Sequence, residues 1–187
     1  MGRLEPLDME QMTAEQRSTA EAIIAGPRGG LRGPFEPWLR SPILADRAQR
    51  LGEFCRFNTG LPPHLSELAI IITGRHWAAQ YEFWAHARMA REAGLPEDTI
   101  EAIRTGREPA FRDDSERAIY TLVTEYFETH RVSDGTYRQA VDALGERGVV
   151  EVVGIVGYYG LVSMTLNIFE VSVPEGVEPP LPEPGGR

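Results

Sequence analysis

A carboxylate and an imidazole lie four residues apart at Glu82 and His86, within the stretch AAQYEFWAHARMAREAGL (78–95). Residues four apart share one face of an α-helix, so these two side chains can contact each other. Glu67 lies in the preceding predicted helix and would join them if the two helices fold together. Such a cluster, once desolvated, is suited to proton transfer near neutral pH. The alternative is a surface Glu–His pair that contributes roughly a few tenths of a kcal/mol.

Other patterns of catalysis or cofactor binding are absent from the sequence. It contains no G-x-G-x-x-G phosphate loop, no H-E-x-x-H zinc motif and no G-x-S-x-G nucleophile elbow. The four histidines are scattered over different segments: His64, His76, His86 and His130. Cys55 is the only cysteine, which excludes an intramolecular disulfide and a cysteine-based metal site. We therefore expect neither a metal nor a cofactor.

The composition is that of an ordinary globular protein, with 42% hydrophobic and 25% charged residues and a formal net charge of −9. A phosphate backbone would be repelled by this charge, so we expect no nucleic-acid partner. Arginines are abundant near residues 28–56, but acidic residues interrupt them, and we interpret this segment as a solvated or interface surface. The first residues, MGRLEPLDMEQMTAEQR, lack the apolar core of a secretory signal, which predicts a cytoplasmic location.

One apolar stretch, residues 149–169, approaches the ~20 residues that a membrane span needs. Glu151 interrupts it, and Asn167 lies near its end. Three glycines recur at every third position, which permits close helix contact: Gly154, Gly157 and Gly160. We interpret this stretch as a helix buried within a domain or an oligomer, and expect no membrane partner.

The elements that must position the Glu–His pair are helices. Capping residues, prolines, glycines and helical spacing of apolar residues predict helices that span about 13–26, 42–60, 63–76, 79–93, 96–106, 115–131, 133–145 and 148–171. The Gly- and Pro-rich residues 26–38 are predicted to form a loop. We expect an all-α fold of about seven helices, with one domain over 1–173, including an N-terminal extension, and a Pro-rich tail over 174–187.

The segment ELAIIITGRHWAAQYEFWAHARMAREAGL (67–95) resembles the carboxymuconolactone decarboxylase family, which also contains alkylhydroperoxidase D. The order of the flanking helices extends the resemblance across about residues 40–170. It implies an alkylhydroperoxidase D-like helical fold. It also implies a homo-trimer or homo-hexamer, in which helices of several protomers pack together and the site lies at or near a subunit boundary.

The chain departs from the peroxidase branch of this family at the redox cysteines. That branch carries E-x11-C-x2-C-x3-H, which places its Glu on Glu67, its two cysteines on Ala79 and Glu82, and its His on His86. A dithiol peroxidase needs a nucleophilic and a resolving thiol, so this departure argues against peroxide reduction. A Glu four residues before the His instead resembles the decarboxylase branch.

The decarboxylase branch implies a cofactor-free lyase that acts on a small lactone or an aromatic-derived carboxylate. His86 would protonate carbon after CO2 loss, and Glu82 or Glu67 would orient the imidazole or hold its proton. Arg75 would pair with a substrate carboxylate, or alternatively with a glutamate at an interface. Isomerisation and lactone hydrolysis would use the same groups.

The same resemblance assigns pocket walls. Trp77, Tyr81 and Trp84 would form an apolar wall for a ring-shaped substrate, although Trp84 would serve equally as core. Tyr158 and Asn167 would add hydrogen bonds if they face the same cavity. The alternative function is a non-enzymatic oligomeric scaffold or small-molecule-binding protein with the same fold.

Overall fold

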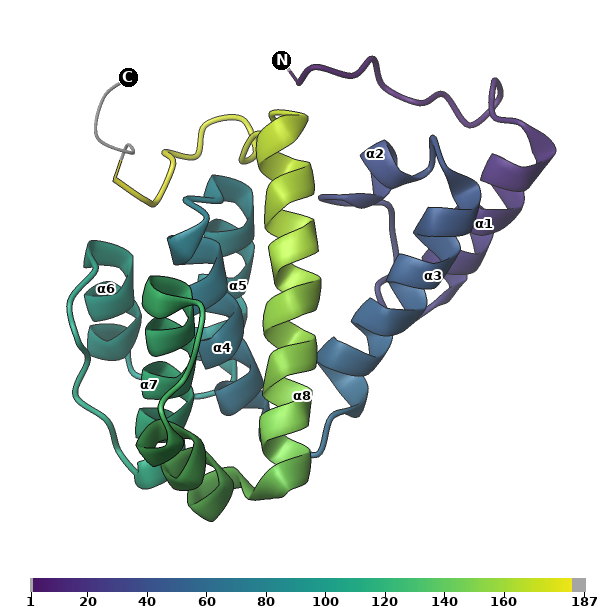
Figure 1. Cartoon of the computed structure of the whole chain (residues 1–187). Coiled ribbons are helices and arrows are strands. Elements are labelled where there is room, and N and C mark those ends of the chain that lie inside the picture. The colour runs from purple at the N-terminus through teal and green to yellow at the C-terminus, as the bar shows by residue number, and fades with distance from the viewer. Residues whose placement is uncertain (1, 183–187) are drawn as a thin grey trace.

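The structure, a computed structural model, describes residues 2–182, and every regular element among them is a helix (Figure 1). The all-α fold class is as predicted. The helices are α1 (Ala14–Ala25), α2 (Phe35–Trp38), α3 (Pro42–Glu53), η1 (Phe54–Asn58), α4 (Pro63–His76), α5 (Gln80–Glu92), α6 (Glu97–Thr105), α7 (Asp114–Thr129) and α8 (Asp134–Ile168). The element η1 is a turn of π-helix that continues α3 directly.

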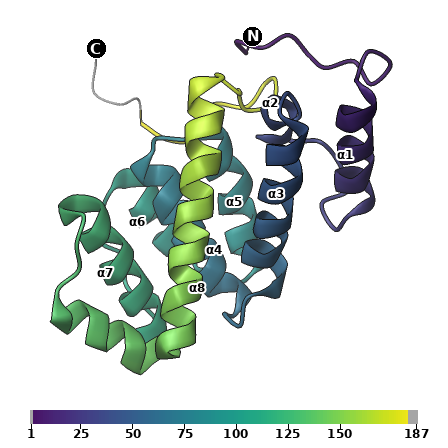
Figure 2. The ribbon, with the colours of Figure 1, turned by 45° about the vertical axis from the view of Figure 1, so that its right-hand side comes forward.

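Helix α8 runs through the middle of the molecule, and the other helices are arranged around it (Figure 1). It packs against α4, α5 and α7 on one side and against α3 on the other, while α1 covers α3 from outside (Figure 2). The core contains fully buried side chains of α4 and α8, among them Leu68, Ile71, Ile155 and Leu166. Helix α4 is buried over the whole of 65–74, which is why it is apolar on nearly every face.

The turn between α4 and α5 brings the predicted site residues together. Pro63 opens α4 at its first turn, where a missing backbone N–H costs nothing. After His76 the chain reverses through a short turn in which Ala78 has a φ of 50°. Helix α5 then packs back along α4. As a result, a residue near the start of α4 faces the middle of α5.

Helix boundaries follow the predicted signals closely, because local caps fix them. Thr13 and Gln16 form a reciprocal capping box at α1, and Ser133 caps α8 by accepting a hydrogen bond from Thr136 N–H. At α7 the cap is Asp113, whose side chain accepts from the N–H of Glu116. The helix therefore starts one residue before the predicted Ser115.

One prediction about elements was wrong. Residues 35–38 of the predicted loop form the short helix α2, because Phe35 and Trp38 are buried and the Trp38 indole donates to Thr165 Oγ1 at 2.9 Å. This hydrogen bond joins residues that are far apart in the sequence, so no local sequence pattern predicts the helix. The two last predicted helices are both present within α8, and the chain bends between them at Gly145, whose φ of 70° and ψ of 163° are not helical.

The apolarity of α8 is accounted for by its place in the core. By length and composition it is the one helix among residues 2–182 that could cross a membrane, yet 56% of its most apolar window is buried inside the fold. Glu151 within it accepts the Gly60 N–H at 2.7 Å and pairs with Arg147 at 2.8 Å. The carboxylate thus ties α8 to the loop after η1. This arrangement fits the core helix of a soluble protein.

The described part of the C-terminal tail lies against the helical domain. The side-chain amide of Gln80 in α5 donates to the carbonyl of Leu181 at 3.1 Å and accepts its N–H at 2.8 Å. Arg104 in α6 donates to the carbonyl of Pro180 at 2.9 Å, and the Leu181 side chain is buried. Residues 183–187 of the predicted tail lie outside the described residues.

Candidate active site

Glu67, Glu82 and His86 form one buried cluster between α4 and α5. His86 Nδ1 lies 2.7 Å from Glu67 Oε2, and His86 Nε2 lies 3.0 Å from Glu82 Oε1. All three residues are less than a tenth exposed. Apart from this ion-pair contact, Glu82 Oε1 is buried without a hydrogen-bond partner. The sequence prediction that these side chains converge therefore agrees with the geometry.

The two carboxylates determine the charge of the imidazole. Burial alone would lower the pKa of His86, but the charges of Glu67 and Glu82 and the hydrogen bonds to them outweigh this cost and raise the pKa to about 9. The imidazole is therefore protonated at neutral pH and donates from Nδ1 to Glu67. The interior of this protein thus holds a protonated imidazole between two carboxylates.

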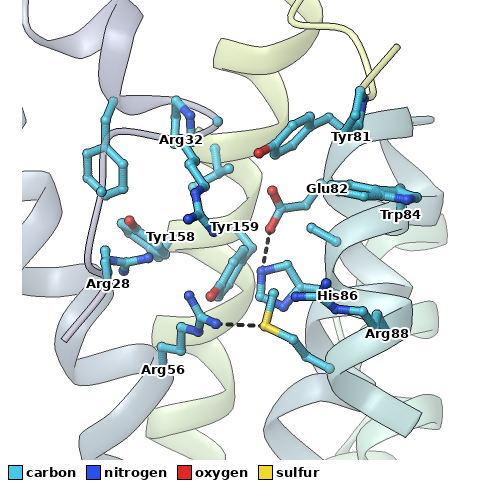
Figure 3. A pocket seen from close by; sticks show the side chains of 18 residues that line it. Arg28, Arg32, Arg56, Tyr81, Glu82, Trp84, His86, Arg88, Tyr158 and Tyr159 are labelled. Carbon is cyan, nitrogen blue, oxygen red and sulfur yellow. Dashed lines mark hydrogen bonds and ion pairs between the residues drawn. The ribbon is translucent and has the colours of Figure 1, made fainter. Parts of the chain in front are cut away.

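This cluster opens onto a cavity of about 380 Å³. Glu82 and His86 line the cavity, whereas Glu67 lies behind the imidazole and does not reach it. The second oxygen of Glu82 points away from His86, toward the side of the cavity where Tyr81 lies (Figure 3). Glu82 is the only carboxylate in the lining among the described residues.

Two tyrosines of α8 line this cavity: Tyr159 forms its floor between His86 and the arginines, and Tyr158 lies beside Arg28 (Figure 3). The Tyr159 ring packs edge-on against His86 with a centroid distance of 4.9 Å, and its buried hydroxyl has no hydrogen-bond partner. Burial, reinforced by the nearby carboxylates, raises the pKa of Tyr159 well above its ordinary value, so it stays a neutral donor. Tyr158 lines the cavity as well, while Tyr159 was missed because the apolar stretch gives no sign of which face is inward.

Three arginines lie across the cavity from the Glu–His pair (Figure 3). Arg28 and Arg32 come from the loop between α1 and α2, and Arg56 comes from η1. The segment that we interpreted as a solvated or interface surface therefore contributes part of the cavity lining. The Gly- and Pro-rich composition of residues 26–34 indicated a loop. The sequence does not specify the folded path of this loop, so it could not show that the arginines reach the cavity.

The remaining predicted pocket residues divide into two groups. Tyr81 and Trp84 line the cavity. Arg75 lies elsewhere and donates from Nε to the carbonyl of Arg104 at 2.9 Å. Trp77 belongs to an apolar groove on another face, and the Asn167 side chain donates to the Trp77 carbonyl at 2.7 Å rather than facing the cavity. The structure thus does not bring Arg75, Trp77 or Asn167 to this site.

Cys55 is poorly suited to thiol chemistry. It is fully buried and is absent from the lining of the cavity. Burial, only partly offset by the charge of Arg28, raises its thiol pKa to about 11, so little thiolate exists at neutral pH. Among residues 2–182, no group of His, Cys, Asp and Glu side chains has the geometry of a metal site.

No protein-family model matches the chain, and no curated protein matches it at a significant level. Among the solved structures that match is the alkylhydroperoxidase AhpD core of an uncharacterized peroxidase-related protein from Ralstonia eutropha JMP134. Its TM-score is 0.76 at 11% sequence identity, covering 93% of each chain. The debrominase Bmp8 in its apo form has a TM-score of 0.68 at 13% identity, covering 91% of each chain.

A cysteine-to-alanine variant of Bmp8 in complex with 2,3,4-tribromopyrrole also matches, with a TM-score of 0.65 at 14% identity, covering 91% of this chain and 90% of that one. At such identities the likeness concerns the fold alone. The chain therefore has the alkylhydroperoxidase D-like helical fold.

Proposed function

We propose that this chain is a cofactor-free enzyme of the carboxymuconolactone decarboxylase type, which transfers protons on a small lactone or aromatic-derived carboxylate. The observation that carries the proposal is the buried Glu67–His86–Glu82 cluster, which reaches a cavity through Glu82 and His86. The cavity volume of about 380 Å³ suits a small ligand, and Tyr81 and Trp84 offer apolar walls for a ring.

The positions of the three residues favour distinct roles. Because both nitrogens of His86 face carboxylates, Glu82 is the group that exchanges a proton with substrate. His86 supplies and recovers that proton through its contact with Glu82. Glu67 is a positioning residue, since it holds Nδ1 from behind and does not reach the cavity. The resemblance to the decarboxylase branch instead implied that His86 itself protonates carbon.

Decarboxylation would proceed in two steps. The bond between the substrate carbon and its carboxylate breaks, CO2 leaves, and the electron pair is delocalised into the conjugated lactone carbonyl. The remote carbon of this dienolate then takes a proton from the Glu82–His86 pair, and water returns a proton to the pair. Isomerisation would use the same pair, first as base and then as acid.

The comparisons support a small ring-shaped substrate in a general way. One neighbour of this fold is a debrominase whose variant was solved with tribromopyrrole, so the fold accommodates a small ring in that protein. Thiol-based peroxide reduction is disfavoured here, because Ala79 and Glu82 occupy the expected cysteine positions and Cys55 is buried.

A non-enzymatic binding protein is the second candidate. It is favoured by the same lack of redox cysteines and by a His86 whose two nitrogens are already occupied. In that case Glu82→Gln and His86→Gln would change ligand affinity while no turnover occurs with any substrate.

The test is a turnover and proton-exchange assay on a panel of unsaturated lactones and aromatic-derived acids in D2O, followed by NMR. We expect CO2 loss or deuterium incorporation at carbon with at least one compound, and a decrease of about 10²–10⁴-fold in Glu82→Gln. Glu92→Gln is the matched control, because Glu92 is an exposed carboxylate on the same helix. Equal rates in Glu82→Gln and the wild type would rule out the assigned role.

We also propose that the protein is a cytoplasmic homo-oligomer, a trimer or a hexamer. An apolar groove of about 560 Å³ runs along α8 beside α7, and Trp77 lies in it. Val150 and Val153 of α8 are 70% and 64% exposed, which is costly for an isolated chain. A second copy of the chain would cover these side chains.

A further inference from the structure

The cavity contains more positive charge than the protein as a whole would suggest. The chain has a formal net charge of −9, yet Arg28, Arg32 and Arg56 line this one cavity and Glu82 is the only acidic side chain among its described lining residues. The protonated imidazole of His86 already compensates part of the charge of Glu67 and Glu82. The cluster thus keeps one negative charge against three guanidinium groups, so positive charge is in excess in this cavity.

None of the three arginines forms an ion pair with a carboxylate of residues 2–182. Arg56 donates to the sulfur of Met89 at 2.7 Å, a weak acceptor, and lies over the Phe57 ring. Arg28 lies 5.1 Å from the centre of the Phe35 ring. Neither contact balances a full positive charge.

Among the three arginines, Arg28 lacks polar partners most clearly. Its Nε and Nη2 atoms are buried and have no hydrogen-bond partner. Arg28 as a whole is partly buried, but buried guanidinium nitrogens without a partner are costly, so native structures normally supply one. The buried hydroxyl of Tyr159, on the floor of the same cavity, also lacks a partner, and it points toward Arg56 in Figure 3.

The fourth arginine of the lining differs from these three. Arg88 is exposed and lies 3.5 Å from Glu92, so its charge is already partly compensated. The unpaired cations are thus confined to the wall that faces Glu82 and His86 (Figure 3).

We propose that Arg28, Arg32 and Arg56 form an anion subsite, which binds an oxyanion group of the ligand while its reacting part faces Glu82 and His86. Guanidinium forks match the planar or tetrahedral oxygens of carboxylates and phosphates, and the Tyr159 hydroxyl adds a neutral donor. The ligand is a small ring compound with a carboxylate or a phosphate group. This inference rests on the proposed function, because both concern the same cavity.

Isothermal titration calorimetry of the full chain tests the subsite with three probes of one shape: benzoate, phenyl phosphate and neutral benzamide. We expect at least one anion to bind and benzamide to bind at least about tenfold more weakly. The anion that binds more tightly identifies the oxyanion group of the ligand as a carboxylate or a phosphate. Equal binding of benzamide, or no binding of either anion at millimolar concentration, would overturn the proposal.

Variants locate the binding. Arg28→Gln and Arg56→Gln should each weaken the anion about tenfold or more, while Arg28→Lys should retain more of the affinity because it keeps the charge. Arg47→Gln is the matched control on α3, since Arg47 is exposed and outside the cavity. Circular dichroism of each variant confirms folding. Unchanged anion affinity in the folded Arg28→Gln and Arg56→Gln variants would contradict the subsite.

Glu82→Gln separates the two proposals. If it keeps anion binding but loses turnover, both stand. If anion binding depends on the arginines but no variant or wild type turns over any acid, the enzyme proposal fails and the subsite remains. If turnover depends on Glu82 but is indifferent to Arg28 and Arg56, the subsite fails alone.

Discussion

At the scale of single residues, the imidazole of His86 is held on both sides by carboxylates, which makes the stability of the fold depend on pH. Its pKa of about 9 in the folded protein lies above the unfolded value of about 6.5. A raised pKa stabilises the folded state fully below pH ~6.5, and this contribution is lost as the pH rises through ~9. The contribution is on the order of 3 kcal/mol.

Urea unfolding at pH 6, 7.5 and 9.5 measures this effect. We expect the free energy of unfolding of the wild type to fall over this range, because the folded protein must release the proton that the two carboxylates hold. His86→Gln should show a much flatter profile. Parallel profiles for the two proteins would contradict the assigned charge of His86.

Residue spacing was sufficient to predict the Glu–His cluster, because residues 82 and 86 share a helix face and Glu67 lies on the adjacent helix. The arginines of the opposite wall could not be found in this way. Arg28 and Arg32 reach the cavity through the path of a Gly- and Pro-rich loop, and such a path depends on distant contacts rather than on periodicity. Arg75 was expected in the site from its place beside the cluster in the sequence, but its side chain extends from α4 to α6, where Nε donates to the carbonyl of Arg104.

At the scale of elements, Gly52 permits the close approach of α3 to α8 beside the cavity. A Cβ atom at Gly52 would lie 2.1 Å from Tyr158 Oη and 2.4 Å from Arg28 Nη2. Tyr158 is buried, so its ring cannot move aside without disturbing the core. The glycine therefore determines both the helix packing and the position of a cavity arginine.

We expect Gly52→Ala to lower the free energy of unfolding by about 1–3 kcal/mol, as is typical of overpacking, and to weaken anion binding. Gly135→Ala is the matched control, because its Cβ would meet only Ser133 Oγ, at 3.8 Å. Chemical denaturation and calorimetry of both variants check this. A stable Gly52→Ala protein with unchanged anion affinity would show that α3 and Arg28 adjust freely.

Element boundaries were predictable where local chemistry sets them, as at the Thr13 capping box and at Pro63. Helix α2 was not, because burial of Phe35 and the Trp38–Thr165 hydrogen bond create it through tertiary contacts.

At the scale of the whole molecule, the exposed apolar surface of α8 predicts self-association. Val153→Glu places a charge in the groove that contains Trp77, so we expect a shift toward smaller species in light scattering coupled to size exclusion. Gln139→Glu makes the same charge change at an exposed position of α8 outside this groove and should leave the mass unchanged. A monomeric wild type would contradict the proposed oligomer.

The protonation state of His86 is the most direct test of the whole account, and a heteronuclear NMR titration of the ¹⁵N-labelled imidazoles measures it. We predict that both His86 nitrogens carry protons until about pH 9, and that Glu67→Gln lowers this midpoint. His76 is the internal reference, because burial lowers its pKa below the ordinary value. Titration of His86 at or below pH ~6.5, the ordinary value, would mean that no proton is held between the carboxylates and would contradict the proposed chemistry.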